Sequence, residues 1–167
     1  ACLWYLGKGE EVPAPVVIEA TTTVPFTLQK PLYAKAAYVY DVSHGKVLFE
    51  RNGELQLPLA SITKLMTALS ASDTLGSTDA VVITDEALAE DGPSGLSSGE
   101  KWSFKNLLDF TLVASSNDGA HAIAGAAGAL VRKTPPGEKD DAAAVRTFVE
   151  KMNSNARTLG MTQTYFL

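Results

Sequence analysis

Two β-rich runs, residues 37–42 and 46–50, are separated by only three residues, Ser43-His44-Gly45. Parallel neighbours need a much longer crossover, so a link this short predicts that the two runs pair as an antiparallel hairpin. Asn52-Gly53 supplies a second turn signal directly after the hairpin. The folded part of the chain is therefore expected to begin with antiparallel β structure.

The next stretch, residues 61–69, has the periodicity of an amphipathic helix. Its apolar residues recur at i, i+3, i+4 and i+7, and they are Ile62, Leu65, Met66 and Leu69. This spacing places all four on one stripe of a helix, and we expect that stripe to face the core.

The rest of the chain alternates short polar breaks with helical patterns. Residues 80–84 are apolar and β-branched, which predicts a short strand. Ser103 is a suitable N-cap for a second helix, and an Ala/Gly-rich third helix is expected to reach about Leu130. A last helix over residues 142–159 should end at Gly160, the residue type that favours the position just after a helix.

The N-terminal region has a different character from the rest. Residues 1–6 are apolar but too few to cross a bilayer, which takes about 20. Two interpretations stay open for them: the outer end of a membrane anchor or signal segment upstream of residue 7, or a segment without a structural role. Cys2 as a lipid attachment site is a further open alternative. Residues 1–33 are interpreted as a stub and Pro/Thr-rich linker, and residues 34–167 as the folded domain.

Charge and composition exclude several classes of protein. With 14 Lys and Arg against 19 Asp and Glu, the net charge of −5 argues against a nucleic-acid partner. A single cysteine excludes an internal disulfide framework and a cysteine-based zinc cage. His44 and His121 have no ligand cluster around them in the sequence, so both are interpreted as structural or exposed. We expect no metal and no cofactor.

Ser61 and Lys64 are the leading catalytic candidates. Three residues apart on a helix, they lie roughly 60° apart on one flank, where the amine can reach the hydroxyl. An amine held among apolar neighbours loses its charge more easily and can then accept the serine proton. A second S-x-x-K spacing, from Ser98 to Lys101, falls in the glycine-bearing loop of residues 91–100, where no helix is expected.

A polar break at Ser115-Ser116-Asn117 separates the second and third predicted helices. A hydroxyl and an amide in such a break can relay a proton and hold a substrate amide. A compatible alternative is that Ser116 or Asn117 caps the helix that follows.

These segments together resemble the serine D-alanyl-D-alanine carboxypeptidases, the low-molecular-mass penicillin-binding proteins of the bacterial wall. The resemblance covers residues 34–167 and rests on four ordered segments: the hairpin, PLASITKLMTAL, GEKWSFKNLLDFTLVASSNDGA and FVEKMNSNARTLGMTQTYF. It implies an α+β fold of the D,D-peptidase and β-lactamase type, in which an antiparallel sheet packs with helices beside a helical subdomain.

The resemblance also implies a role for each candidate residue. Ser61 would be the acylated nucleophile and Lys64 its base, while Ser115 would relay the proton and Asn117 would bind the substrate amide. Ser116 stands where the family usually has glycine, and we expect this change to be tolerated because that residue is not catalytic.

The third motif of the family, K-T-G, does not occur in these 167 residues. Lys133-Thr134 is followed by Pro135, which cannot supply a strand N–H, so we interpret this match as a decoy. In the family the motif lies on a strand well beyond the position of Leu167. The C-terminal strands are therefore expected to be missing here, and this chain alone is expected to be inactive.

The implied activity is removal of the terminal D-Ala of peptidoglycan stem peptides through an acyl-Ser61 intermediate, outside the cytoplasm, with β-lactams as inhibitors. Three alternatives stay open: a D,D-endopeptidase, a β-lactamase and a non-catalytic wall-binding module. Glu150 stands where a β-lactamase would carry its deacylating glutamate, but the surrounding sequence lacks E-x-x-L-N, so it is expected on the exposed face of the last helix.

Overall fold

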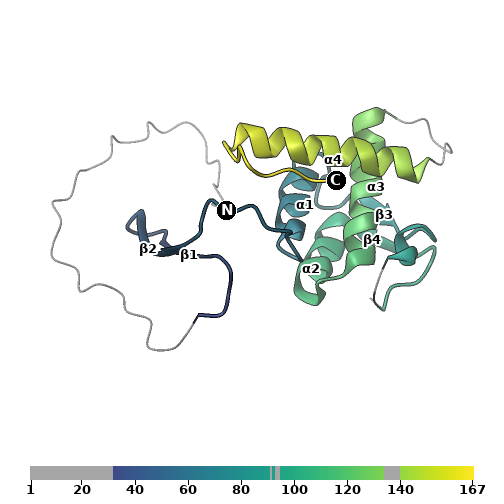
Figure 1. Cartoon of the computed structure of the whole chain (residues 1–167). Coiled ribbons are helices and arrows are strands. Elements are labelled where there is room, and N and C mark those ends of the chain that lie inside the picture. Colours follow the sequence, from purple (N-terminus) through teal and green to yellow (C-terminus); the bar gives the residue numbers. More distant parts are fainter. Residues whose placement is uncertain (1–31, 91, 93–94, 134–139) are drawn as a thin grey trace. The chain divides into compact units, whose positions relative to one another are not determined.

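The computed structural model describes residues 32–90, 92, 95–133 and 140–167 (Figure 1). The chain divides into two compact units, Ala1–Gly53 and Glu54–Leu167. The apolar opening, Cys2 and nearly all of the Pro/Thr-rich stretch lie outside the described residues. The boundary expected between residues 33 and 34 stays a prediction.

The first unit contains the predicted hairpin. Strands β1 (Ala37–Asp41) and β2 (Lys46–Arg51) pair antiparallel, with one register shift midway. The carboxylate of Asp41 closes the turn, because it accepts the backbone N–H groups of Ser43 and His44 and contacts the His44 ring at 2.6 Å. The hydrogen bond from the His44 side chain holds the pKa of Asp41 below its ordinary value. The histidine therefore has a structural partner, as predicted.

The second unit combines four helices with a small sheet. Its elements are α1 (Thr63–Ser72), β3 (Ala80–Val82), the 3-10 turn η1 (Ala87–Ala89), β4 (Lys101–Ser103), α2 (Phe104–Ala114), α3 (Asn117–Arg132) and α4 (Asp141–Thr158). Helix α3 contacts the three other helices, η1 and β3, and α4 lies across α1 and α3 (Figure 1). Among the described residues, the helices lack the combination of length and apolarity that a membrane span requires.

Several helix ends are where the sequence predicts them. The Ser103 hydroxyl accepts the N–H of Asn106 and caps α2. Gly160 follows α4 with φ +72°, a backbone conformation that glycine adopts without steric cost. Strand β4 was not predicted, because a three-residue strand is too short for a period-two pattern to show. It pairs antiparallel with β3 and leads directly into α2.

The expected orientation of α1 is wrong for most of its apolar stripe. Ile62 is 61% exposed, and Leu65 and Leu69 are exposed as well, while only Met66 of the four is buried. The face that packs against the neighbouring helices is small and polar instead; its residues are Lys64, Thr67, Ser70 and Ala71. Small side chains let the helices approach closely, and this packing leaves the larger aliphatic residues outside.

The core of the second unit lies between α3 and its neighbours. Its largest fully buried side chains include Phe148 of α4, Leu107 of α2 and Ile123 of α3. Helices α3 and α4 are in close contact at Gly128, where a Cβ atom would collide with the backbone carbonyl of Ala144. The glycines and alanines of α3 therefore serve close helix packing.

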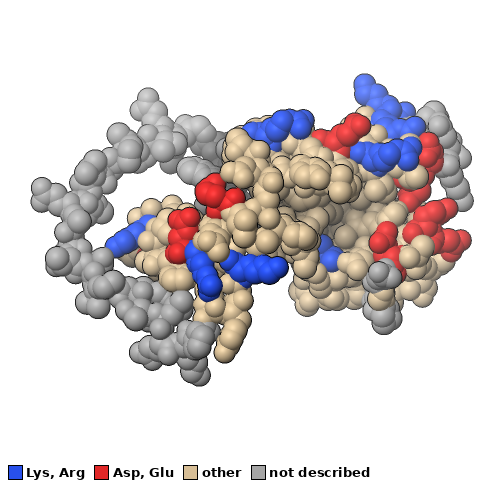
Figure 2. Space-filling model, in the orientation of Figure 1, with Lys and Arg blue, Asp and Glu red and all other residues tan. Residues whose placement is uncertain are grey.

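Charged side chains of both signs are interspersed on the face shown in Figure 2. Lys and Arg do not form an extended patch over the described residues in that view.

Candidate active site

Ser61 lies in the tight turn that leads into α1. Two i→i+3 hydrogen bonds of 3.0 Å define that turn, from the N–H of Thr63 to the carbonyl of Ala60 and from the N–H of Lys64 to the carbonyl of Ser61. The serine therefore precedes the first full helical residue, and its side chain is exposed. An exposed hydroxyl at the start of a helix is accessible to a substrate.

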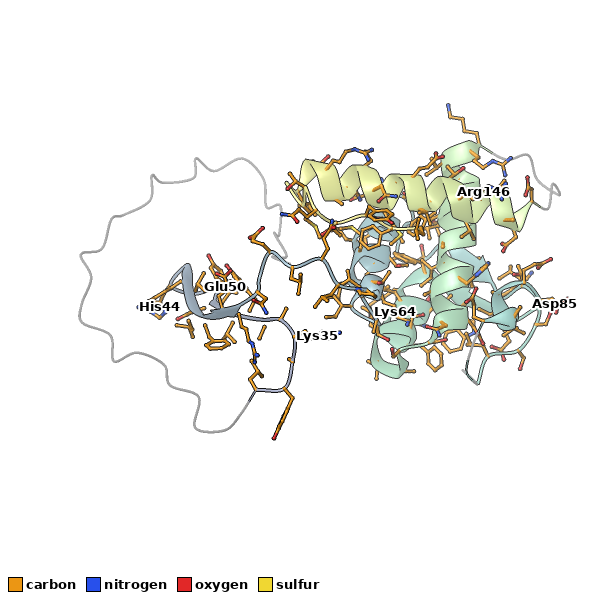
Figure 3. The ribbon with its side chains drawn as sticks, viewed as in Figure 1. Lys35, His44, Glu50, Lys64, Asp85 and Arg146 are labelled. Atoms are coloured by element: carbon orange, nitrogen blue, oxygen red, sulfur yellow. The ribbon has the colours of Figure 1, made fainter. Side chains whose placement is uncertain are left out.

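Lys64 is buried, with 8% of its surface exposed, on the face of α1 that packs against the other helices. Its Nζ donates to Asn117 Oδ1 at 2.7 Å and to Ser61 Oγ at 3.4 Å. Figure 3 shows Lys64 near the ends of α2 and α3 that come together. The predicted reach of this amine to the Ser61 hydroxyl is thus present in the structure.

Ser115 completes the contact on the other side of Ser61. Its hydroxyl donates to Ser61 Oγ at 2.5 Å. The residue is the C-cap of α2 and has left-handed backbone angles, φ 56° and ψ 36°, which are unfavourable for a side chain with a Cβ. The carbonyl of Thr111 accepts the N–H groups of both Ser115 and Ser116, and these bonds close the end of α2.

The two interpretations of the polar break both apply, to different residues: Ser116 caps a helix, and Asn117 contacts a candidate site residue. Ser116 is the N-cap of α3, and its hydroxyl accepts the N–H of Gly119 at 3.0 Å. Asn117 is the first residue of α3, and its side chain contacts Lys64. The break therefore both caps a helix and brings two polar side chains to Ser61 and Lys64.

This arrangement suits nucleophilic chemistry at Ser61. Its oxygen lies within hydrogen-bonding distance of an amine on one side and of a second hydroxyl on the other. A buried amine next to an exposed hydroxyl is the pairing by which a serine can be activated without histidine. All four predicted residues, Ser61, Lys64, Ser115 and Asn117, lie in this one cluster.

The sequence matches interpreted as decoys lie elsewhere. Lys133 is the C-cap of α3, at the opposite end from Asn117 and about 24 Å away along a 16-residue helix. Thr134 and Pro135 lie outside the described residues. Glu150 is on the exposed face of α4, as predicted. The second S-x-x-K spacing ends in β4 at Lys101 rather than in a helix.

A histidine in α3, His121, bridges two carboxylates from other segments, which no sequence pattern indicates. His121 Nδ1 contacts Glu90 Oε1 at 2.8 Å, and its Nε2 contacts Asp141 Oδ2 at 2.7 Å. Partial burial lowers the pKa of His121, but the hydrogen bonds to Asp141 and Glu90 outweigh it and raise that pKa above its ordinary value. The three residues are far apart in sequence, so no local pattern indicates the bridge. Within the described part of the chain, no group of three or more ligands has a geometry that could hold a metal ion.

Comparisons with known proteins agree with this geometry. The profile of the family described as D-alanyl-D-alanine carboxypeptidase matches residues 21–167. A D-alanyl-D-alanine endopeptidase of Pseudomonas aeruginosa is 34% identical over 143 residues, which cover 84% of this chain and 42% of that protein. A D-alanyl-D-alanine carboxypeptidase of Bacillus subtilis is 31% identical over 139 residues, or 80% of this chain and 32% of that protein.

A solved structure shares the fold. A Streptomyces DD-transpeptidase superposes with a TM-score of 0.69 at 26% identity, and the match covers 84% of this chain and 53% of that one. The α+β fold predicted from the resemblance is thereby confirmed for the part of the fold that this chain contains. The chain spans 42% of the length of the first of these curated relatives and 32% of the second.

Proposed function

The chain belongs to the D-alanyl-D-alanine carboxypeptidase family, and on this premise we propose that it forms the serine-bearing part of a D,D-peptidase that acts on peptidoglycan. The proposed reaction removes the terminal D-Ala of a stem peptide. The observation that carries the proposal is the position of Ser61 Oγ between Lys64 Nζ and Ser115 Oγ.

In the proposed mechanism, Lys64 in its neutral form accepts the Ser61 proton as the oxygen attacks the carbonyl of the D-Ala–D-Ala peptide bond. The C–N bond then breaks, and the proton returns through Ser115 to the nitrogen of the departing D-Ala. Asn117 holds an amide of the substrate. Water next attacks the acyl-Ser61 ester, which releases the shortened peptide and restores the serine.

The burial of the four residues supports this division of roles. Lys64 is shielded from water and held by two hydrogen bonds, whereas the side chains of Ser61, Ser115 and Asn117 are exposed. The groups that must meet a substrate are thus accessible, and the proposed base is sheltered. A β-lactam, which mimics the dipeptide, would acylate the same oxygen and act as an inhibitor.

We expect catalysis to need a K-T-G segment in addition to these residues. That motif, which the family resemblance implies, is absent from residues 1–167. A polypeptide of only these residues should therefore have negligible peptidase turnover, because the loss of one oxyanion donor alone costs about 10²–10³ in rate. Ordinary turnover by this polypeptide would show that the described cluster is sufficient by itself.

The decisive experiment is covalent labelling by a fluorescent penicillin, carried out on the protein as its organism makes it. The expected result is one label per chain, located at Ser61 by peptide mass spectrometry and lost in Ser61→Ala. Ser72→Ala, which changes an exposed serine at the far end of α1, is the matched control and should keep the label. Absence of label on the wild type, or equal label on Ser61→Ala, refutes the proposal.

Endopeptidase activity is the second candidate, because the relative from Pseudomonas aeruginosa carries that name. The two reactions share the acyl-Ser61 step and differ in the substrate bond. Release of D-Ala from a soluble pentapeptide indicates a carboxypeptidase, whereas cleavage of a cross-linked muropeptide dimer indicates an endopeptidase. Rapid turnover of a chromogenic cephalosporin would instead indicate a β-lactamase.

The substrate also determines where the protein should act. Peptidoglycan stem peptides lie outside the cytoplasm, so we propose an extracytoplasmic location, in the periplasm or at the outer face of the membrane. An anchor upstream of residue 7 is a further proposal. Fractionation of cells, followed by detection of the penicillin-labelled band, tests both.

A further inference from the structure

The two-residue link between α2 and α3, Ser115-Ser116, lies within the candidate cluster. Helix α2 ends at Ala114 and α3 begins at Asn117, so two site residues directly flank Ser116. Ser115 points to Ser61 on one side of it, and Asn117 points to Lys64 on the other. A change in the backbone at Ser116 would therefore move both contacts.

The backbone of this link is strained on one side. Ser115 has a left-handed conformation, which is unfavourable for a residue with a Cβ. Helix C-termini commonly place glycine in that conformation, but glycine has no hydroxyl to offer Ser61. Neighbouring interactions must therefore hold Ser115 in place.

Ser116, the next residue, makes hydrogen bonds to both helices of the link. Its side chain is buried, at 5% exposure, and its Oγ accepts the N–H of Gly119 at 3.0 Å. Its own N–H donates to the Thr111 carbonyl, the same oxygen that receives the N–H of Ser115. Ser116 thus ties the end of α2 to the beginning of α3. A Cβ at Gly119 would collide with Thr111 Oγ1, so the two helix ends are also in tight contact.

We propose that the Ser116 hydroxyl is a positioning group for the reaction at Ser61, through the cap that it forms on α3. This inference rests on the proposed function, since it assigns Ser116 a role in setting the geometry of that site. A glycine at this position could not form the side-chain bond to Gly119. In this chain the Ser116 hydroxyl restricts the backbone between α2 and α3, because it is bonded to the N–H of Gly119.

The first test observes the cluster without activity. The ¹³Cε and ¹⁵Nζ resonances of Lys64 are recorded by NMR for wild type, Ser116→Ala and Ser116→Asp, in the protein as its organism makes it. The alanine variant should shift these resonances, because Asn117 moves relative to Lys64, and aspartate should restore them as an alternative cap. Ser103→Ala removes the serine cap of α2, away from the cluster, and should leave the Lys64 resonances unchanged.

The second test measures the rate of penicillin acylation in the protein as its organism makes it. Ser116→Ala should slow acylation by about threefold to thirtyfold, the fold-change that corresponds to a lost cap. Ser116→Asp should recover most of the rate, while Ser103→Ala should lower stability without slowing acylation. If Ser116→Ala folds poorly, Ser116→Gly is used instead, because glycine keeps most of the capping propensity without the hydroxyl.

The two tests separate the failure of this inference from that of the proposed function. Unchanged Lys64 resonances in both Ser116→Ala and Ser116→Gly overturn the positioning role, whatever the activity. An unlabelled wild type overturns the proposed function, while shifted resonances would still support the role of the cap in the geometry. Equal acylation rates in wild type and both variants also overturn the positioning role.

Discussion

Ser115 Oγ donates a 2.5 Å hydrogen bond to Ser61 Oγ across a sequence separation of 54 residues. The contact joins the turn before α1 to the end of α2, and Lys64 lies on the other side of the same oxygen at 3.4 Å. Two different helix ends must therefore be held in register for the site to exist.

Two replacements of Ser115 separate the effect of its hydroxyl on the acylation rate from the effect of its backbone conformation on stability. Ser115→Gly and Ser115→Ala both lose the contact with Ser61, so both should slow penicillin acylation to the same extent. Their stabilities should differ, because glycine adopts the left-handed conformation freely and alanine does not. We expect the free energy of unfolding of the glycine variant to exceed that of the alanine variant by about 1 kcal/mol, as measured by urea denaturation.

Equal stability of the two Ser115 variants would contradict the left-handed conformation in solution. A suitable control is the same pair of substitutions at Ser72, near the end of α1. There the backbone is helical, so alanine should be the more stable replacement.

Asn117→Asp tests whether Lys64 must lose its proton. A carboxylate 2.7 Å from Nζ would hold the amine in its charged form, whereas Asn117→Ala adds no charge. Both variants lose the proposed contact with the substrate amide. We therefore expect acylation of Asn117→Asp to be slower than that of Asn117→Ala by at least about tenfold at neutral pH.

The matched control for this charge is Asn106→Asp, on an exposed position of α2. It should leave the acylation rate unchanged. If Asn117→Asp and Asn117→Ala acylate at the same rate, Lys64 does not act as the proposed base.

The His121 bridge predicts a pH dependence of stability. Because the hydrogen bonds to Asp141 and Glu90 raise its pKa in the folded protein, protonated His121 stabilises the fold. That contribution is complete below about pH 6.5, the ordinary value for histidine, and is lost as pH rises through the raised folded-state pKa. His121→Asn should remove this fall in stability, as measured by urea denaturation between pH 5 and 9.

His44→Asn provides the comparison for His121, since His44 is exposed and contacts only one carboxylate, Asp41, in the first unit. It should leave the pH profile of the second unit unchanged. A wild-type profile that coincides with that of His121→Asn would exclude a stabilising bridge.

Gly128→Ala tests the close contact of α3 with α4. The new Cβ would collide with the backbone carbonyl of Ala144, which cannot move without the helix. We expect the free energy of unfolding to fall by about 1–3 kcal/mol, although alanine is the better helix former.

Gly125→Ala is the counterpart one turn earlier in α3. There the Cβ would lie 2.6 Å from Asp141 Oδ1, a side-chain atom that can shift more easily than a backbone carbonyl, although its carboxylate also contacts His121. The loss of stability should therefore be smaller than for Gly128→Ala. A larger loss for Gly125→Ala would show that the close packing of α3 and α4 is not centred on Gly128.

Local chemistry was enough to predict part of this molecule. The hairpin, the Ser103 cap and the end of α4 at Gly160 follow from short-range signals, and the structure confirms them. The candidate residues Ser61 and Lys64 are the two ends of one i→i+3 turn, so their contact also follows from spacing. Helix ends and hairpin turns depend on a few adjacent residues, and a single sequence contains that information.

Features that depend on packing could not be predicted in the same way. The apolar stripe of α1 predicted a core face, but the core is on the opposite side, where small residues admit neighbouring helices. The contact of Ser115 with Ser61 was implied only by the family resemblance. The bridge from His121 to Glu90 and Asp141 spans three segments, and no periodicity marks it. Tertiary contacts between distant segments leave no local pattern.

The contact at Gly128 also has a consequence for the position of Asn117 at the other end of α3. Gly128 lies 11 residues along α3 from Asn117, a lever of about 16 Å. If α3 tilted slightly against α4 about Gly128, Asn117 would be displaced further than the residues near Gly128. The Lys64–Asn117 distance would then change. Helix α4 supplies none of the four candidate residues, yet it packs against the helix that begins with Asn117.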